Sequence, residues 1–273
     1  MFKIAYGAGH YLHTAGKRLP KELDATQTRE WVLNDRVARY FAEAAGQYEG
    51  VALLRVDDAT GNKEITLGAR CRAANQWGAD MCLAIHHNAG INLGTGGGIC
   101  AFAYKEGTKA AEYRDAIYDA CIAAGGLKGN RYDPTLTADF YVLLNTNAPA
   151  VLMEYGFMDS KTDAPVILTE AYSKLVAYAT MEGIAKAAGL KKKVAQEEEP
   201  QGYTLSFRYL QEGSEGEDVR TAQQLLTAKG FSLSADGIFG PKTKQAVVQF
   251  QKKQGIAADG VVGETTMARL WGL

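Results

Sequence analysis

The stretch MCLAIHHNAG, residues 81–90, places an apolar run directly before two histidines. KIAYGAGH has the same form and ends on His10, and AVLMEYG carries Glu154 at the end of its apolar run. Runs that are apolar at almost every position predict strands of a sheet covered on both faces. If these strands run parallel, His10, His86 and Glu154 emerge at one carboxyl edge of the sheet. The three stretches thus predict both a fold and the place of a site.

Strand-like and helix-like patterns alternate through residues 1–190. The strand-like runs lie at residues 2–6, 51–56, 81–85, 98–104 and 150–155. Helical periodicity of apolar residues occurs at about residues 28–45, 66–77, 108–124 and 164–188. This alternation is typical of an α/β domain. We expect an α/β fold with a twisted, mostly parallel sheet flanked by helices.

A charged segment separates this domain from a smaller one. KKKVAQEEEPQG has no apolar period and predicts a solvated linker at 191–203. Beyond it, in residues 204–273, DGIFGPKT at 236–243 recurs as DGVVGETT at 259–266. Each copy combines a tight Asp-Gly turn with the opening of a helix, and a further helix is expected at 217–229. A small all-α three-helix domain is predicted. Its expected core residues are Val219, Leu225, Leu226, Val247, Phe250 and Leu270.

Composition excludes several classes of protein. The 273 residues are 47% hydrophobic and 22% charged, which excludes wholesale disorder. With 30 basic and 31 acidic residues the net charge is −1, so the chain lacks the cationic surplus of a dedicated nucleic-acid binder. No apolar run reaches the roughly 18 residues of a membrane span. The start MFKIAYGAGH has neither a basic region nor a cleavage site, so we expect cytoplasmic synthesis without a signal peptide.

The four cysteines are widely spaced and form no CxxC pair. In a reducing compartment such cysteines serve as small hydrophobic residues. We therefore expect buried, free thiols. The four are Cys71, Cys82, Cys100 and Cys121.

Helical phase places Glu30 on the apolar stripe of the helix that is expected from about residue 28. The residues sharing this stripe are Leu33, Val37, Tyr40 or Phe41, and Ala44. A carboxylate on a buried face is costly unless it is paired or bound to a metal. One alternative is a salt bridge to a nearby arginine. The arginines in question are Arg36, Arg39 and Arg55.

The other alternative for Glu30 is a metal centre at the carboxyl edge of the sheet. Two imidazoles and one carboxylate, from His10, Glu30 and His86, leave a fourth coordination position open to water, as catalytic zinc sites do. Glu154 would then be the general base.

Two further histidines have the same ligand chemistry as this set. His13 follows His10 closely, and His87 neighbours His86. Because successive side chains of a strand point to opposite faces, we expect only one of His86 and His87 to reach the metal.

Five segments occur in this order along the chain: GAGH, REWVLNDRVARYFAEA, LLRVDD, RCRAANQWGADMCLAIHHNAG and PAVLMEYGFMDS. Together they resemble the zinc-dependent N-acetylmuramoyl-L-alanine amidases of bacterial cell-wall turnover and phage lysis. AIHHNAG is similar to the family's S-I-H-x-N-A, and PAVLMEYGF to its P-x-V-L-x-E-x-G-F. The resemblance covers residues 1 to about 188.

This resemblance implies zinc ligands at His10, Glu30 and His86 and a catalytic glutamate at Glu154. The implied reaction is hydrolysis of the amide bond between N-acetylmuramic acid and L-alanine in peptidoglycan.

Some positions depart from the family pattern. Tyr11 stands where the family usually has glycine, Trp31 where it has lysine, and Ala84 where serine is common. None of these removes a ligand, and we expect Tyr11 and Trp31 to narrow or extend the substrate groove. Asn88 and Arg70 match the pattern, and we assign Arg70 a structural role.

The C-terminal repeat, with GSEGEDVRTAQQLL before it and AVVQFQKKQG within it, resembles the peptidoglycan-binding three-helix module of cell-wall hydrolases over residues 205–273. The implied partner is bacterial peptidoglycan, which the protein reaches after release from the cytoplasm, as a phage or prophage endolysin. Alternatives are a mother-cell lysis amidase, a zinc peptidase on stem or cross-link peptides, and a wall-binding protein with an inactive centre. The complete set of four site residues argues against the last.

Overall fold

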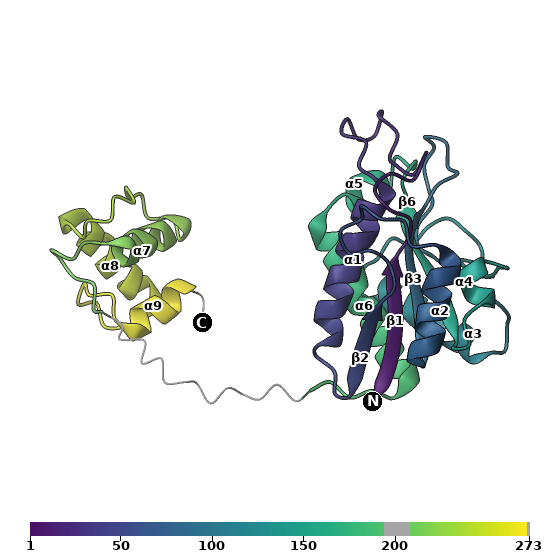
Figure 1. The fold of residues 1–273 in the computed structure, drawn as a ribbon. Helices are drawn as coiled ribbons and strands as arrows, with labels where there is room; N and C mark the ends of the chain where they lie inside the picture. The colour runs from purple at the N-terminus through teal and green to yellow at the C-terminus, as the bar shows by residue number, and fades with distance from the viewer. Residues whose placement is uncertain (194–207, 272–273) are drawn as a thin grey trace. The chain divides into compact units, whose positions relative to one another are not determined.

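The computed structural model describes residues 1–193 and 208–271 (Figure 1). Packing divides the chain near residue 194 into two compact units. The first unit contains strands and helices, and the described part of the second contains helices. In the described residues, no helix is both long and apolar enough to cross a membrane.

A sheet of six strands forms the centre of the first unit, within residues 1–193. Its strands lie in the order β2-β1-β3-β6-β4-β5. Their bounds are β1 Phe2–Ala8, β2 Val51–Arg55, β3 Met81–Asn88, β4 Cys100–Ala103, β5 Thr135–Thr137 and β6 Ala150–Phe157. Neighbouring strands are parallel except for the antiparallel pair β4 and β6. The predicted α/β class with a mostly parallel sheet is therefore confirmed.

Helices cover both faces of this sheet (Figure 1). Their bounds are α1 Glu30–Ala45, α2 Leu67–Trp77, α3 Lys109–Ala123, α4 Tyr141–Leu144, α5 Ala164–Ile167 and α6 Glu170–Ala188. Helices α1, α3 and α6 pack on one face, and α2 and α4 on the other. Along β1, Ile4 and Tyr6 face the first layer and Ala5 faces the second. Because both faces are covered, the strand runs are apolar at almost every position.

Some elements differ from the expected ones. The helix expected at 164–188 is divided into α5 and α6, because the Thr169 side chain caps α6 by accepting a hydrogen bond from Tyr172 N–H. The short elements β5 and α4 have no counterpart among the expected elements. Segments of three and four residues are too short to show an apolar period.

The four cysteines are free and buried, which confirms the expectation for them. Burial raises the pKa of the Cys82 thiol to about 12 and that of Cys100 to about 11. These side chains are therefore neutral thiols at physiological pH, and they act as small apolar groups of the core.

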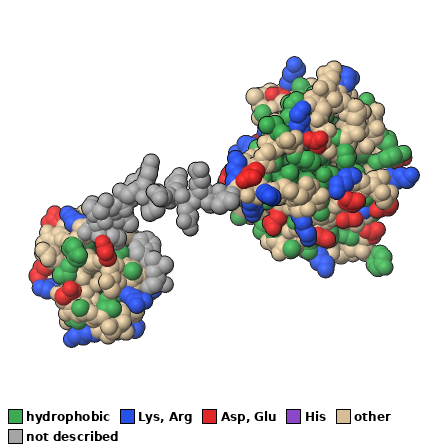
Figure 2. Space-filling model, turned by 90° about the horizontal axis from the view of Figure 1, so that it is seen from below, with side chains coloured by type: hydrophobic (Ala, Val, Ile, Leu, Met, Phe, Trp, Pro, Cys, Tyr) green, Lys and Arg blue, Asp and Glu red, His purple; other side chains and the backbone are tan. Residues whose placement is uncertain are grey.

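Charged side chains of both signs are interspersed on the face of each unit that Figure 2 shows. Neither sign gathers into a single large patch on this face. Its charge is locally balanced, in keeping with the net charge of −1.

The predicted linker, residues 191–203, lies mainly outside the described residues. Its first three residues are described, and they pair with the loop that follows α1. Lys193 N–H donates to the Gln47 carbonyl (2.7 Å), and Glu49 N–H donates to the Lys191 carbonyl (2.9 Å). These hydrogen bonds attach the start of the segment to the first unit.

Three helices form the described part of the second unit. Their bounds are α7 Glu217–Ala228, α8 Pro241–Gln254 and α9 Glu264–Trp271. They enclose a core that consists of Leu210, Val219, Ala222, Leu226, Phe239, Ala246, Val247, Phe250, Val262, Met267 and Leu270. Of the expected core residues, Leu225 is only partly buried, and the others belong to this core. The all-α prediction is confirmed.

Each copy of the DG repeat is held by one buried glutamine. Gln251 Nε2 lies within hydrogen-bond distance of Asp259 Oδ1 (2.8 Å), the Val261 carbonyl (2.9 Å) and Thr266 Oγ1 (3.1 Å). Gly260 N–H donates to Gln251 Oε1 (2.9 Å). In the first copy, the corresponding residues are Gln223, Gly237, Asp236, Ile238 and Thr243. Sequence reasoning found both turns and missed the glutamines, because each lies in the helix before its turn.

Replacing Gln251 by leucine is expected to destabilise the second unit by about 3 kcal/mol, because it leaves the buried Gly260 N–H without its acceptor. Scanning calorimetry of the full chain measures the loss. Gln249→Leu is the matched control, since Gln249 is an exposed glutamine on the same helix. Equal unfolding temperatures of the two variants would contradict the role of Gln251.

Candidate metal centre

Two predicted site residues lie side by side on neighbouring strands. His86 on β3 and Glu154 on β6 are register partners in the parallel pair. The strands continue past both residues, to Asn88 and Phe157, so the site lies within the carboxyl ends of the strands and not just after them. Because partners in a ladder point to the same face, both side chains face the layer of α2 and α4.

The third residue, His10, follows β1 in a tightly constrained turn. Its φ of 64° is in the left-handed region, which few residues other than glycine adopt. The Arg70 guanidinium supports this turn by donating to the carbonyls of Ala8 (2.5 Å) and His10 (3.0 Å). At Gly9, an added Cβ would lie 2.1 Å from His86 Cε1, so only glycine fits. Arg70 thus holds the backbone of the site, as its expected structural role requires.

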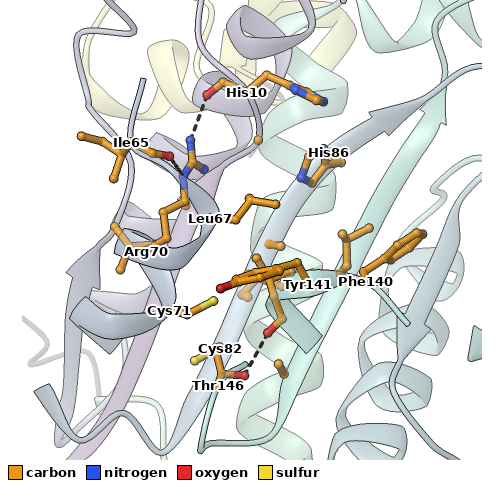
Figure 3. Close-up of a pocket in the computed structure, with 18 of the residues that line it drawn as sticks. His10, Ile65, Leu67, Arg70, Cys71, Cys82, His86, Phe140, Tyr141 and Thr146 are labelled. Carbon is orange, nitrogen blue, oxygen red and sulfur yellow. Dashed lines mark hydrogen bonds between the residues drawn. The ribbon is translucent and has the colours of Figure 1, made fainter. Parts of the chain in front are cut away.

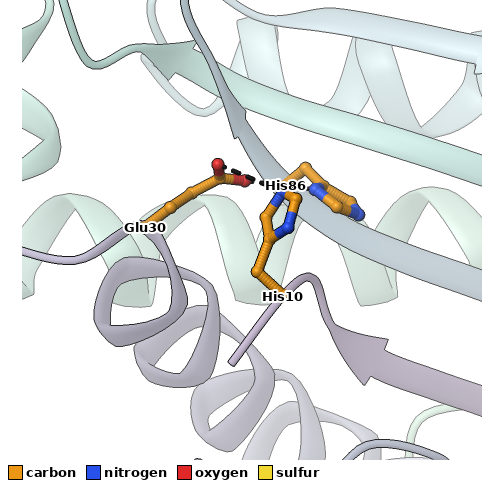
Figure 4. Close-up of side chains that lie close together, drawn as sticks. All are labelled: His10, Glu30 and His86. Atoms are coloured by element: carbon orange, nitrogen blue, oxygen red, sulfur yellow. Dashed lines mark hydrogen bonds and ion pairs between the residues drawn. The ribbon is translucent and has the colours of Figure 1, made fainter. Parts of the chain in front are cut away.

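Glu30 begins α1 and is fully buried. Its Oε1 lies 3.1 Å from His86 Nδ1 and accepts hydrogen bonds from Asn34 Nδ2 (3.2 Å) and His87 N–H (3.3 Å). Its Oε2 lies 3.3 Å from His10 Nε2. Figure 4 shows the carboxylate pointing toward both imidazoles, which lie next to each other. Helix α1 and the two strands therefore bring three predicted ligands to one point.

The alternative salt bridge from Glu30 to an arginine does not form. Arg55 pairs with Asp35 and Asp57, and Arg36 donates to a backbone carbonyl. Arg39 also pairs with Asp35. Each of these arginines therefore has a partner other than Glu30.

The basic side chain beside Glu30 is Lys17, whose Nζ lies 3.5 Å from Oε2. Sequence reasoning missed Lys17, because it lies in a loop without an apolar period. The only signal in the sequence was its position between the two predicted ligands His10 and Glu30.

The other two histidines lie outside the cluster. His87 is buried on the opposite face of the sheet, and its Nδ1 lies 2.8 Å from Asn34 Oδ1. Burial lowers the pKa of His87 to about 3, so this ring is neutral. His13 is exposed and packs against the ring of Tyr11. As expected from strand alternation, only His86 of the adjacent pair faces the cluster.

The chemistry of the cluster fits a metal ion. The donor atoms of His10, Glu30 and His86 all lie within 4.8 Å of one another. Burial lowers the pKa of His10 to about 4, which leaves its imidazole neutral and able to act as a ligand. Although burial opposes ionisation of Glu30, the bond to His86 lowers the pKa of the carboxyl to about 2. Its buried Oε2 has no hydrogen-bond donor. Two imidazoles and one carboxylate are ligands that zinc prefers.

Glu154 lies beside the cluster without belonging to it. Its Oε2 is buried and has no hydrogen-bond partner. Burial raises the pKa of Glu154 to about 7, and the charge of Glu30 adds to this rise while that of His86 opposes it. A carboxyl group with this pKa can both accept and donate a proton near neutral pH.

A cavity of about 430 Å³ opens beside the cluster, between the sheet and the layer of α2 and α4 (Figure 3). Its floor is made of small strand residues, among them Ala5, Gly7 and Ala84. His86, Glu154 and Tyr11 line it. Trp31 does not line it, since this side chain is buried and packs against Gly61. The expectation that Trp31 shapes a substrate groove was therefore wrong. Of these two residues, Tyr11 is the one that lines the cavity.

An α/β sheet that brings three potential metal ligands and a buried carboxylate to the edge of a cavity is the arrangement expected of a hydrolase. The chain belongs to the N-acetylmuramoyl-L-alanine amidase family, whose model matches residues 6–186. A second model, for a putative peptidoglycan binding domain, matches residues 215–270.

Similar proteins agree with this assignment. A sporulation-specific N-acetylmuramoyl-L-alanine amidase of Bacillus subtilis is 34% identical over 149 residues, which are 54% of each chain. An endolysin of Bacillus phage SPP1 is 32% identical over 128 residues, 45% of this chain and 46% of that one. The chain thus spans about half the length of these relatives. The crystal structure of an N-acetylmuramoyl-L-alanine amidase from Clostridium difficile shares the fold, with a TM-score of 0.61 and 22% identity over 69% of this chain and 97% of that one.

Proposed function

We propose that this protein is a zinc-dependent amidase that hydrolyses the bond between N-acetylmuramic acid and L-alanine in bacterial peptidoglycan. The observation that carries the proposal is the juxtaposition of His10, Glu30 and His86 with the unpartnered carboxyl of Glu154. The match to the amidase family over residues 6–186 supplies the substrate class.

The roles of the residues follow from this arrangement. His10, Glu30 and His86 would hold the ion, and Arg70 fixes the backbone that presents His10. A zinc ion held there would lower the pKa of a bound water and polarise the scissile carbonyl. The cavity beside the cluster receives the substrate on the side of His86 and Glu154.

Glu154 moves the proton. It accepts a proton from the attacking water and then gives it to the departing amine of L-alanine. The C–N bond breaks, the lactyl group keeps a carboxylate, and the stem peptide leaves with a free amino terminus. The pKa of about 7 for Glu154 suits both steps.

Analysis of digested walls tests this function. Purified peptidoglycan is incubated with the zinc-loaded protein, and the products are identified by mass spectrometry and amino-terminal labelling. We expect new N-terminal L-alanine and intact glycan strands. New ends within the stem or cross-link peptides would assign a zinc peptidase instead, and no release of any fragment from several wall types would overturn the proposal.

Chelation is expected to stop the reaction, and added zinc to restore it. The reason is that no side chain of the proposed site can take over the ion's role in activating water. A thiol reductant is expected to leave the rate unchanged, since all four cysteines are free and buried. Turbidity loss of a wall suspension measures both effects. Full activity in protein shown by metal analysis to contain no metal would contradict the mechanism.

We also propose that the second unit binds the wall and that the protein acts there after release from the cytoplasm, as an endolysin. The match to a peptidoglycan binding domain at 215–270 and the similarity to a phage endolysin support this role. A mother-cell lysis role also has a named relative, the sporulation-specific amidase. The neighbouring genes distinguish the two roles, since lysis genes of a phage or sporulation genes would flank the reading frame.

A chain that ends at Val194 is expected to fold and to retain hydrolysis of soluble muropeptides, because every proposed site residue lies in the first unit. Its sedimentation with intact walls is expected to fall relative to the full chain. Circular dichroism and a binding assay with purified walls check the two parts. Loss of muropeptide hydrolysis in the folded, zinc-loaded shorter chain would show that the units do not act independently.

A further inference from the structure

The Lys17 ammonium contacts the carboxylate of the metal-ligand cluster. Its Nζ lies 3.5 Å from Glu30 Oε2, the buried oxygen that has no hydrogen-bond donor. Its side chain is 43% exposed, and it lines the same cavity as His86 and Glu154. The ammonium group therefore reaches both the cluster and the space where a substrate would lie.

The fold holds Lys17 at this place. Its carbonyl accepts a hydrogen bond from Glu30 N–H (3.1 Å), so the backbones of the two residues are joined. The next residues extend this pairing, with a bridge between Arg18 and Arg29. Leu19 N–H donates to the Thr28 carbonyl (3.0 Å). Since the backbone is fixed and the lysine stem is flexible, the ammonium can move between Glu30 and the cavity without movement of the loop.

The charges of the cluster give this lysine two effects on the site. A divalent ion and the ammonium are attracted to the same carboxylate oxygen, so Lys17 opposes binding of the ion. An ion bound to Glu30 would offset the negative charge of the carboxylate and so weaken the attraction that holds the ammonium beside Oε2. Because the Lys17 side chain is half-exposed and lines the cavity, it can then extend into that cavity.

We propose that Lys17 turns from Glu30 into the cavity when the metal is bound and there stabilises the negative charge that develops on the scissile carbonyl oxygen. The inference rests on the proposed amidase function. No proton is transferred by Lys17, because its role is electrostatic. A positive charge aimed at a developing oxyanion in a partly dry site lowers the barrier of such a reaction.

The proposal predicts opposite changes in metal affinity and turnover. In Lys17→Met, zinc is expected to bind about tenfold more tightly, because a competing positive charge has been removed. In the same variant, kcat on a soluble muropeptide is expected to fall by about 100-fold with KM little changed, because the charge acts only in the transition state. Lys17→Arg, which keeps the charge, is expected to retain most of kcat.

Lys21→Met is the matched control, an exposed lysine on the same loop that contacts neither the cluster nor the cavity. Zinc affinity is measured by competition with a chromogenic chelator, and folding by thermal unfolding. Weaker zinc binding together with lower kcat in Lys17→Met would mean a merely structural role and overturn the proposal. Tighter zinc binding with unchanged kcat would overturn it too. Failure of the amidase function itself would appear in the unmodified protein, as zinc binding without wall cleavage.

Discussion

Replacing Glu154 by glutamine is expected to lower kcat by about 1,000-fold while zinc content and unfolding temperature stay unchanged. Glutamine keeps the size and shape of the side chain, but it cannot accept the proton of the attacking water. Glu154 accepts no hydrogen bond at its buried Oε2, so the substitution breaks no contact there. The substitution also removes a buried ionisable group and introduces no new buried charge.

The measurement combines steady-state kinetics on a soluble muropeptide with metal analysis of the same sample. Glu22→Gln is the control, since Glu22 is exposed and lies in the loop before α1. A Glu154→Gln protein that keeps more than a tenth of the unmodified kcat would rule out this residue as the general base.

Replacing Glu30 by glutamine is expected to act first on the metal, with zinc affinity lowered by about 100-fold or more, because a neutral amide is a poor zinc ligand. The new amide group would also face hydrogen-bond donors. In the unmodified protein, Glu30 Oε1 accepts from Asn34 Nδ2 and His87 N–H, and Oε2 lies near the Lys17 ammonium. The NH₂ group of glutamine, placed at either position, would therefore meet another donor instead of an acceptor. We therefore also expect a lower unfolding temperature.

Zinc titration separates the two glutamates. Activity of Glu30→Gln is expected to rise as zinc is added in excess, whereas Glu154→Gln stays inactive at every zinc concentration. If Glu154→Gln proved empty of zinc and Glu30→Gln proved loaded but inactive, the two roles would have to be exchanged.

Much of the site could be predicted from local patterns. His86 and Glu154 each end an apolar strand run, and parallel strands bring their carboxyl ends to one edge. Glu30 stood out because a carboxylate on the apolar stripe of a helix requires a partner. In each case a short period, of two residues in a strand or 3.6 in a helix, gives the direction of the side chain.

Other features depend on contacts between distant segments and leave no such period. Lys17 reaches Glu30 because a loop folds back along the start of α1, and Arg70 from α2 supports the turn at His10. Asn34 of α1 joins Glu30 to His87 of β3. The small residues that leave the cavity open, such as Ala84, line up only when the strands are in register.

The sequence by itself determined the α/β class, the repeat of the helical unit and the identity of the candidate ligands, because local side-chain periodicity and turn chemistry encode these features. Only the tertiary structure decided that β4 runs against β6, that Trp31 is buried away from the cavity, and that Lys17 and not an arginine faces Glu30. The physical reason is that loops and strand order are set by packing between segments far apart in the chain. No local pattern of residue types specifies that packing.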